Sequence, residues 1–195
     1  MPPRPHLTFV RHGQCVANAQ GRVAGQLDSP LTTLGYRQAE ATAVLLAPRK
    51  DLTAVVTSDL QRARATAQII AGVLDLPLHT EPGLREQCFG AMEGQRFEDL
   101  VASGPTAGHI NEIRWGNGES VADVYARLAD TFDRIRGAHP GPVVLVTHGH
   151  VIQIGMALLQ GRGARDIEWF DLPNGGIVNC PVTGAELTAP VAEGA

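Results

Sequence analysis

The chain has 195 residues, 44% of them hydrophobic and 18% charged, a composition typical of an ordinary globular protein, so we expect a single domain spanning 1–195. The formal net charge of −4 excludes a general attraction for nucleic acid or anionic membranes, so anion recognition requires a local group of cations. No apolar run is long enough for a signal peptide or a spanning helix, and the three cysteines form no CxxC pair, so we expect a cytoplasmic protein with reduced thiols.

Short apolar runs alternate with longer segments whose apolar residues recur at helical spacing. In chain order they predict a strand over 7–10, a helix over about 34–46, a strand over 54–57, helices over 60–74 and 121–135, a strand over 143–147 and a helix over 149–159. This order indicates an α/β fold, a three-layer sandwich with a mostly parallel central sheet flanked by helices. The Gly-rich stretch 81–119 is expected to form a lid or pocket wall, and we expect a frayed tail over 188–195.

Chemically active side chains follow two of the predicted strands. Arg11, His12 and Gly13 come directly after the first strand, and His148 and Gly149 come directly after the last. The carboxyl ends of parallel strands meet at one edge of a sheet, where ligands bind, so we expect these residues to converge there. Each motif taken singly is equally compatible with a polar turn at the surface.

Arg62 falls in the first turn of a predicted helix that follows a strand. The free backbone N–H groups and the positive end of the helix dipole at that position add to the guanidinium charge and favour an anion. The alternative is a solvated helix arginine, as we expect Arg64 to be. Taken alone, Arg62 is better explained as a solvated helix arginine.

The motifs taken together resemble the histidine phosphatase superfamily, which includes cofactor-dependent phosphoglycerate mutases and many small phosphatases. The segments that carry the resemblance extend over nearly the whole chain: 11–18, 26–32, 58–63, 84–86, 118–120 and 147–149. One departure is Cys15, where the family often has Thr, and the loss of that hydroxyl could weaken phosphate binding without removing the nucleophile. The resemblance implies a phosphoglycerate mutase-like fold and a metal-independent phosphomonoesterase that uses neither metal nor cofactor.

The resemblance also implies a role for each site residue. Catalytic roles fall on His12, Glu86 and His148, and substrate binding falls on Arg11, Gly13, Asn18, Gly25, Arg62 and Gly149. His12 would attack phosphorus and become a phosphohistidine, while the arginines and Asn18 bind the phosphoryl oxygens. The nearby cations should disfavour a second proton on His12, and His148 would be the protonated partner. Glu86 would protonate the leaving oxygen and then accept a proton from water.

Three other functions can be considered for the same residues, and each requires a feature that the sequence does not offer. A Cys-dependent phosphatase built on Cys15 and Arg22 needs a shorter loop than the six residues, 16–21, that separate them. A metal hydrolase is suggested by His148 and His150, but no Asp accompanies them and Arg11 would repel a divalent cation. A non-catalytic module that binds a phosphorylated ligand would be favoured by loss of the nucleophile or of an arginine, and all are present.

The alcohol that leaves the phosphate is not identified by sequence beyond a small phosphorylated metabolite, and we expect Gln87, Phe89 and Met92 to shape its pocket. A phosphoglycerate mutase is the main functional alternative. The interval 87–147 has few basic residues and the chain after Leu187 carries no charge except Glu193, whereas a mutase must enclose a bisphosphorylated intermediate. We therefore predict hydrolysis, with neither nucleic acid nor a membrane as a partner and with a homodimer possible.

Overall fold

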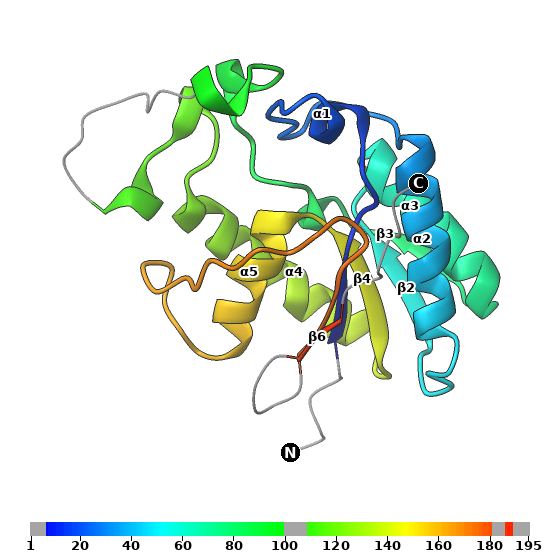
Figure 1. Cartoon of the computed structure of the whole chain (residues 1–195). Helices are drawn as coiled ribbons and strands as arrows, with labels where there is room; N and C mark the ends of the chain where they lie inside the picture. The colour runs from blue at the N-terminus through cyan, green and yellow to red at the C-terminus, as the bar shows by residue number, and fades with distance from the viewer. Residues whose placement is uncertain (1–6, 100–108, 181–185, 189–195) are drawn as a thin grey trace.

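The computed structural model describes residues 7–99, 109–180 and 186–188, and these residues form an α/β fold around one six-stranded sheet (Figure 1). The strand order is β3-β2-β4-β1-β5-β6. The first four strands in this order are parallel, and β5 and β6 run antiparallel to their neighbours. The strands are β1 Leu7–Arg11, β2 Ala54–Thr57, β3 Leu78–Thr80, β4 Val143–Thr147, β5 Ile177–Cys180 and β6 Glu186–Thr188.

Helices cover both faces of the sheet, which gives the predicted three layers. The α-helices are α1 Val16–Ala19, α2 Thr33–Leu46, α3 Gln61–Leu74, α4 Val121–Ala138 and α5 Gly149–Leu159. Figure 1 shows α2 and α3 on one side of the sheet and α4 and α5 on the other. Successive strand side chains point to opposite faces, so Phe9 and Leu145 pack in the core under α4 and α5 while Val10 and Val144 pack under α2 and α3.

The predicted fold class is confirmed, and the predicted strands and longer helices occur within a few residues of their expected bounds. Sequence reasoning missed β3, β5 and β6. All the side chains of β3 are exposed, so this edge strand lacks the apolar run that marks a buried strand. The expectation of a frayed tail was wrong at Thr188, which pairs with Ile177 in the sheet; 189–195 lie outside the described residues.

The stretch 81–119 contains only short 3₁₀ helices in its described part. They are η1 Pro82–Leu84, η2 Gly90–Met92, η3 Phe97–Asp99, η4 Ile110–Glu112 and η5 Trp115–Asn117. Two turns of this stretch pack backbone against backbone: a Cβ on Gly116 would lie 2.1 Å from the Phe89 carbonyl oxygen, and the residue has a positive φ of 58°. Glycine is therefore required there. The stretch forms the predicted pocket wall, as described below.

No helix within the described residues combines the length and the apolar composition needed to cross a lipid bilayer.

Candidate active site

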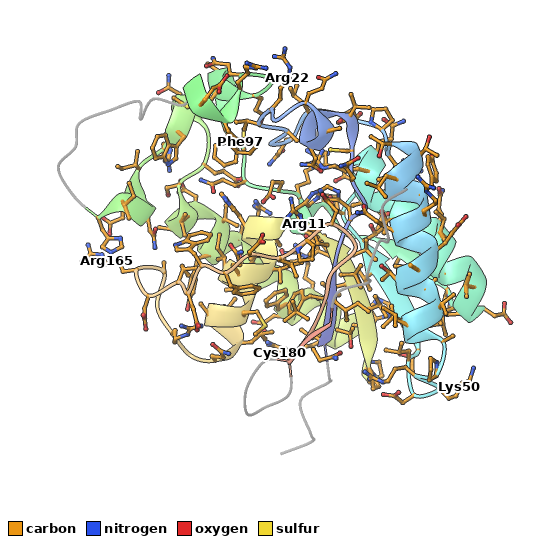
Figure 2. All side chains as sticks on the ribbon, viewed as in Figure 1. Arg11, Arg22, Lys50, Phe97, Arg165 and Cys180 are labelled. Atoms are coloured by element: carbon orange, nitrogen blue, oxygen red, sulfur yellow. The ribbon has the colours of Figure 1, made fainter. Side chains whose placement is uncertain are left out.

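Two histidines meet at the carboxyl ends of the central strands. β1 and β4 are adjacent and parallel, with Arg11 opposite Thr147, so the residues that follow each strand emerge side by side. The His12 amide donates to the Thr147 carbonyl at 3.0 Å, and the rings of His12 and His148 lie edge to face with centroids 5.1 Å apart. Sheet topology thus unites residues separated by most of the chain. Figure 2 shows Arg11 at this end of the sheet and Cys180 toward the other.

The tautomer of His12 is fixed by the backbone. Its Nδ1 lies 2.7 Å from the Gly13 carbonyl oxygen, which can only accept a hydrogen bond, so Nδ1 carries the proton. The lone pair is therefore on Nε2, which accepts a hydrogen bond from Arg62 Nε at 3.2 Å. Burial, then the charges of Arg62 and Arg11, hold the pKa of His12 well below its ordinary value of 6.5. The neutral imidazole that a nucleophile requires is thus the favoured form.

Arg62 is buried, with an exposed fraction of only 1%, and is not the solvated arginine of the alternative reading. Its Nη1 donates to the Leu27 carbonyl at 2.8 Å and its Nη2 to the Gly25 carbonyl at 2.6 Å. Together with the bond to His12 these contacts fix the plane of the guanidinium, and the group has further N–H donors for a ligand. Arg64, two residues later, is exposed as expected.

Arg11 and Asn18 complete the donors around His12 Nε2. Arg11 Nη1 donates to the Leu172 carbonyl, and Arg11 Nε is buried with no hydrogen-bond partner among the described residues. Asn18 Oδ1 accepts from the Cys15 amide and from Asn174 Nδ2, both at 3.2 Å, so its own amide group is left to donate. The residues His12, Arg11, Arg62 and Asn18 together are called the phosphate end below.

The predicted glycines have different surroundings. Gly25 and Gly149 line the cavity, and Gly25 has a positive φ of 47° that directs its carbonyl to Arg62. Gly13 is not among the lining residues: its amide donates to Thr66 Oγ1 at 3.0 Å, and a Cβ there would lie 2.2 Å from the Gly35 carbonyl oxygen. Its backbone amide is thus committed to the protein, and the glycine serves close packing.

His148 lies behind His12 and is fully buried rather than exposed in the cavity. Its Nε2 shares a hydrogen bond of 3.0 Å with Ser58 Oγ, and its Nδ1 has no partner among the described residues. Burial and then the charge of Arg62 hold the pKa of His148 well below its ordinary value. The protein alone therefore favours a neutral ring, in contrast to the expected protonated partner, and an adjacent phosphate dianion would act in the opposite direction.

Glu86 reaches the cavity from a segment with no regular secondary structure. Its Oε1 accepts from the Gln87 amide at 2.9 Å, and its backbone carbonyl accepts from Gln26 Nε2 at 3.0 Å. Residues 83–88, called the acid segment below, need other groups to hold this conformation because they contain no continuous helix or strand.

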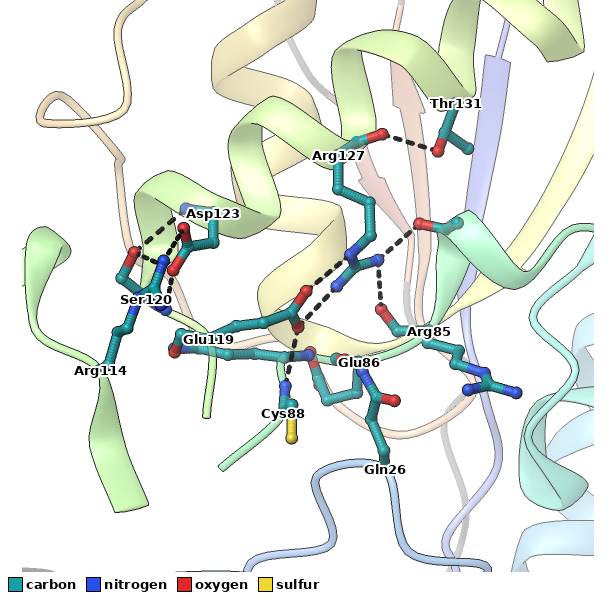
Figure 3. Close-up of polar contacts among 12 residues, drawn as sticks. Gln26, Arg85, Glu86, Cys88, Arg114, Glu119, Ser120, Asp123, Arg127 and Thr131 are labelled. Carbon is teal, nitrogen blue, oxygen red and sulfur yellow. Dashed lines mark hydrogen bonds and ion pairs between the residues drawn. The ribbon is translucent and has the colours of Figure 1, made fainter. Parts of the chain in front are cut away.

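An ion pair holds the acid segment in place (Figure 3). Arg127 of α4 pairs with both oxygens of Glu119, through Nε at 2.9 Å and Nη2 at 3.0 Å. Its Nη1 donates to the carbonyls of Gly83 at 2.6 Å and Arg85 at 3.0 Å, while Glu119 Oε2 accepts from the Cys88 amide at 2.9 Å. The pair thus binds the backbone on both sides of Glu86.

These groups surround a cavity of about 340 Å³. It is lined by Arg11, His12, Asn18, Val23, Ala24, Gly25, Arg62, Glu86, Phe89, Phe97, Gly149, His150, Gln153, Trp169, Phe170, Asp171 and Leu172. Of the predicted site residues, only Gly13 and His148 are set back from it. A separate groove of about 490 Å³, lined by Asp28, Tyr36, Asp59, Arg64 and their neighbours, lies outside this convergence of catalytic side chains.

A family model described as the histidine phosphatase superfamily, branch 1, matches residues 7–189. The chain belongs to this superfamily. It is 35% identical over 155 residues to a metal-independent phosphoserine phosphatase of Arabidopsis thaliana, a match that covers 75% of this chain and 65% of that protein. It is also 35% identical over 167 residues to a probable phosphoglycerate mutase, GpmB, of Yersinia enterocolitica, covering 78% of this chain and 74% of that protein.

Among solved structures, a mycobacterial glucosyl-3-phosphoglycerate phosphatase in complex with VO3 has a TM-score of 0.81 and 28% sequence identity, with 98% of this chain and 100% of that chain covered. The predicted membership of the histidine phosphatase superfamily is therefore confirmed by sequence and by fold.

In this histidine phosphatase Cys15 is a buried neighbour of the site and does not line the cavity. Its thiol lies 3.1 Å from Asn18 Oδ1. The thiol of Cys15 thus contacts Asn18 from the position where the family often has Thr. His150 Nδ1 lies 2.9 Å from Gln87 Oε1, and the described residues hold no group of three or more His, Cys, Asp or Glu side chains that could bind a metal ion.

Sequence reasoning missed two residues that organise the site. Asn174 holds both the His12 carbonyl and Asn18, at 3.1 and 3.2 Å, from a turn whose Pro-Asn-Gly-Gly sequence, 173–176, is a turn signal that could have drawn attention to it. Arg127 was assigned only to an amphipathic helix, and no local pattern identifies its long-range contacts with the acid segment.

Proposed function

We propose that this chain hydrolyses a small phosphorylated metabolite without a metal ion, through a phosphohistidine formed on His12. The observation that carries the proposal is the state of His12: its proton is fixed on Nδ1, and its Nε2 lone pair lies among the donors of Arg62, Arg11 and Asn18. Such an arrangement suits attack on a phosphomonoester dianion, because the donors neutralise the phosphoryl oxygens while the nucleophile stays unprotonated.

In the first step His12 Nε2 forms a bond to phosphorus as the bond from phosphorus to the alcohol oxygen breaks. Glu86 in its acid form gives its proton to that oxygen, so a neutral alcohol leaves. In the second step a water oxygen attacks phosphorus, Glu86 takes the water's proton, and the phosphorus–nitrogen bond breaks to release inorganic phosphate and neutral His12. His148 lies against His12 and would stabilise the transferred group, since a phosphate dianion raises the pKa of a neighbouring imidazole.

Hydrolysis rather than mutase activity is supported by the arginines of the interval 87–147. A mutase needs cations for a second phosphate, and every arginine in this interval is ion-paired. The pairs are Arg96 with Glu98, Arg114 with Asp123, Arg127 with Glu119, Arg134 with Glu81 and Arg136 with Asp133. The site residues all extend from a single sheet and its connections, so we also propose one domain. Cys15 and Cys88 are free thiols, as expected in a reducing compartment, and we propose that the protein acts in the cytoplasm.

The test is labelling during turnover of a phosphomonoester, with the reaction stopped in alkaline denaturant so that an acid-labile adduct survives. The wild-type protein should release inorganic phosphate at an undiminished rate in excess EDTA, and should carry a phosphoryl adduct that is labile in acid and stable in base. His12→Ala should show neither activity nor adduct. Loss of activity in EDTA with rescue by one metal ion would replace this proposal with a metal hydrolase.

A further inference from the structure

Aromatic rings line the part of the cavity that extends away from His12. The His150 ring lies edge to face with Phe89, centroids 5.7 Å apart, and with Trp169, centroids 5.1 Å apart. Trp169 is 45% exposed and Phe97 is 57% exposed, although both line the cavity. Large aromatic side chains usually bury most of their area, so these rings offer apolar surface to a ligand. Phe89, Phe97, His150 and Trp169 are called the aromatic end below.

Two chain connections place the aromatic end beyond the leaving oxygen. Residues 169–172 run from Trp169 to Leu172, whose carbonyl accepts from Arg11 at the phosphate end. On the side of the acid segment, Gln87 follows Glu86 directly and accepts from His150 through Oε1 at 2.9 Å. An alcohol whose oxygen is protonated by Glu86 therefore directs the rest of its structure toward His150 and Trp169.

The charges around this space disfavour an anionic alcohol. The carboxylates of Glu86 and Asp171 line the cavity, and among the described lining residues the only arginines are Arg11 and Arg62, which belong to the phosphate end. A carboxylate on the alcohol would thus have no guanidinium of its own, in a cavity that already holds the Asp171 carboxylate, an arrangement that opposes binding.

We propose that the alcohol released here is uncharged and carries a planar ring that stacks at the aromatic end, as a nucleoside does. This inference rests on the proposed phosphatase activity for its chemistry, but the recognition can be measured without turnover. The inference predicts that the protein prefers nucleoside-type monophosphates to phosphoserine and phosphoglycerate, which carry carboxylates and have no ring.

The decisive measurement is calorimetric binding of uridine 5′-monophosphate and O-phosphoserine to His12→Ala, which keeps the cavity but cannot turn over. We expect the nucleotide to bind more tightly, on the order of tenfold, because base–aromatic stacking adds to a shared phosphate contact. Adding Trp169→Ala should abolish that preference, Trp169→Phe should retain most of it, and Tyr36→Ala, an exposed aromatic outside the cavity, should leave it unchanged. Equal or tighter binding of O-phosphoserine would overturn the inference.

Turnover by the wild-type protein shows whether the ring preference alone is wrong or whether the proposed phosphatase function is wrong. A higher kcat/KM for uridine 5′-monophosphate than for O-phosphoserine and 3-phosphoglycerate supports both proposals. The reverse order, with phosphate still released, overturns the ring preference and leaves the phosphatase in place. No phosphate release from any of these substrates, with none from p-nitrophenyl phosphate, overturns the proposed function itself.

Discussion

The phosphate end and the acid segment face one another across the cavity but are held in different ways. At the phosphate end, His12 follows a central strand, Arg62 starts a helix, and backbone carbonyls fix both side chains. The acid segment lies among short 3₁₀ turns, and the pair between Arg127 and Glu119 anchors it to α4. The proposed nucleophile is thus part of the core, while the position of the proposed proton donor depends on a few side-chain contacts.

The largest effect is expected from His12→Ala, which removes the nucleophile from the rigid end. Turnover should fall by about 10³-fold or more, because His150, the other histidine that lines the cavity, belongs to the aromatic end. His12 is only 3% exposed, so a small loss of stability is expected from the lost packing, although the protein should stay folded. Phosphate release and thermal unfolding by circular dichroism measure the two effects. A variant that retains more than a few per cent of activity would exclude His12 as nucleophile.

Arg62→Ala should come next, with a loss in kcat of about 10²–10³-fold, since a bidentate donor acts most strongly on the charge of the transition state. Arg62→Lys should recover little, because an ammonium group cannot meet the Leu27 and Gly25 carbonyls and His12 Nε2 in one plane. Arg64→Ala is the matched control, because it lies on the same helix but is exposed. Steady-state kinetics decide: an effect on KM alone, equal to that of Arg64→Ala, contradicts the assignment.

Arg127→Lys tests the acid segment, and it should lower activity by disturbing the position of Glu86. A lysine keeps the charge but cannot hold Glu119 and the Gly83 and Arg85 carbonyls together, so the acid segment should loosen. Proton donation matters more for a poor leaving group. We expect kcat/KM to fall about tenfold or more for an alkyl phosphate and much less for p-nitrophenyl phosphate.

The control for that experiment is Arg136→Lys, because Arg136 lies on the same helix and pairs with the exposed Asp133. Arg136→Lys should leave kcat/KM unchanged for both the alkyl phosphate and p-nitrophenyl phosphate. If Arg127→Lys lowered kcat/KM by the same factor for both leaving groups, the ion pair would have a general structural role and no specific connection to the proton transfer.

The free energy of unfolding should depend on pH because His12 and His148 are buried. The pKa values of His12 and His148 are both held well below 6.5, so the unfolded chain binds more protons than the folded one as pH falls below this value. Stability should therefore decrease on acidification, by up to about 1.4 kcal/mol per pH unit for each imidazole. Urea unfolding between pH 7.5 and 5.5 measures the slope, and His12→Ala should reduce it. An unchanged slope would show that His12 gains no proton on unfolding.

The same contrast explains what sequence could predict. His12, Arg62 and His148 sit beside strand and helix boundaries that hydrophobic periodicity locates, and parallel topology then brings them together. The contacts of Arg127 with the acid segment join residues some forty positions apart, and the acid segment has no periodicity of its own, so no local rule specifies these contacts. Burial also lowers the pKa of His148 in the protein without a ligand, and sequence cannot anticipate this because burial is known only from packing.

The smallest expected effect is that of added 2,3-bisphosphoglycerate on the interconversion of 2- and 3-phosphoglycerate. A mutase uses this compound to phosphorylate its histidine and then passes the phosphoryl group to a second substrate, which requires cations for the second phosphate and for the carboxylate. The cavity offers two arginines, and it is also lined by the carboxylic side chains of Glu86 and Asp171. We therefore expect negligible interconversion of 2- and 3-phosphoglycerate with or without the bisphosphate, followed by nuclear magnetic resonance alongside phosphate release. Interconversion faster than release would show that the acid segment excludes water well enough for a mutase. In that case His12 would still be the nucleophile, and the acid segment would have to close over the substrate and exclude water.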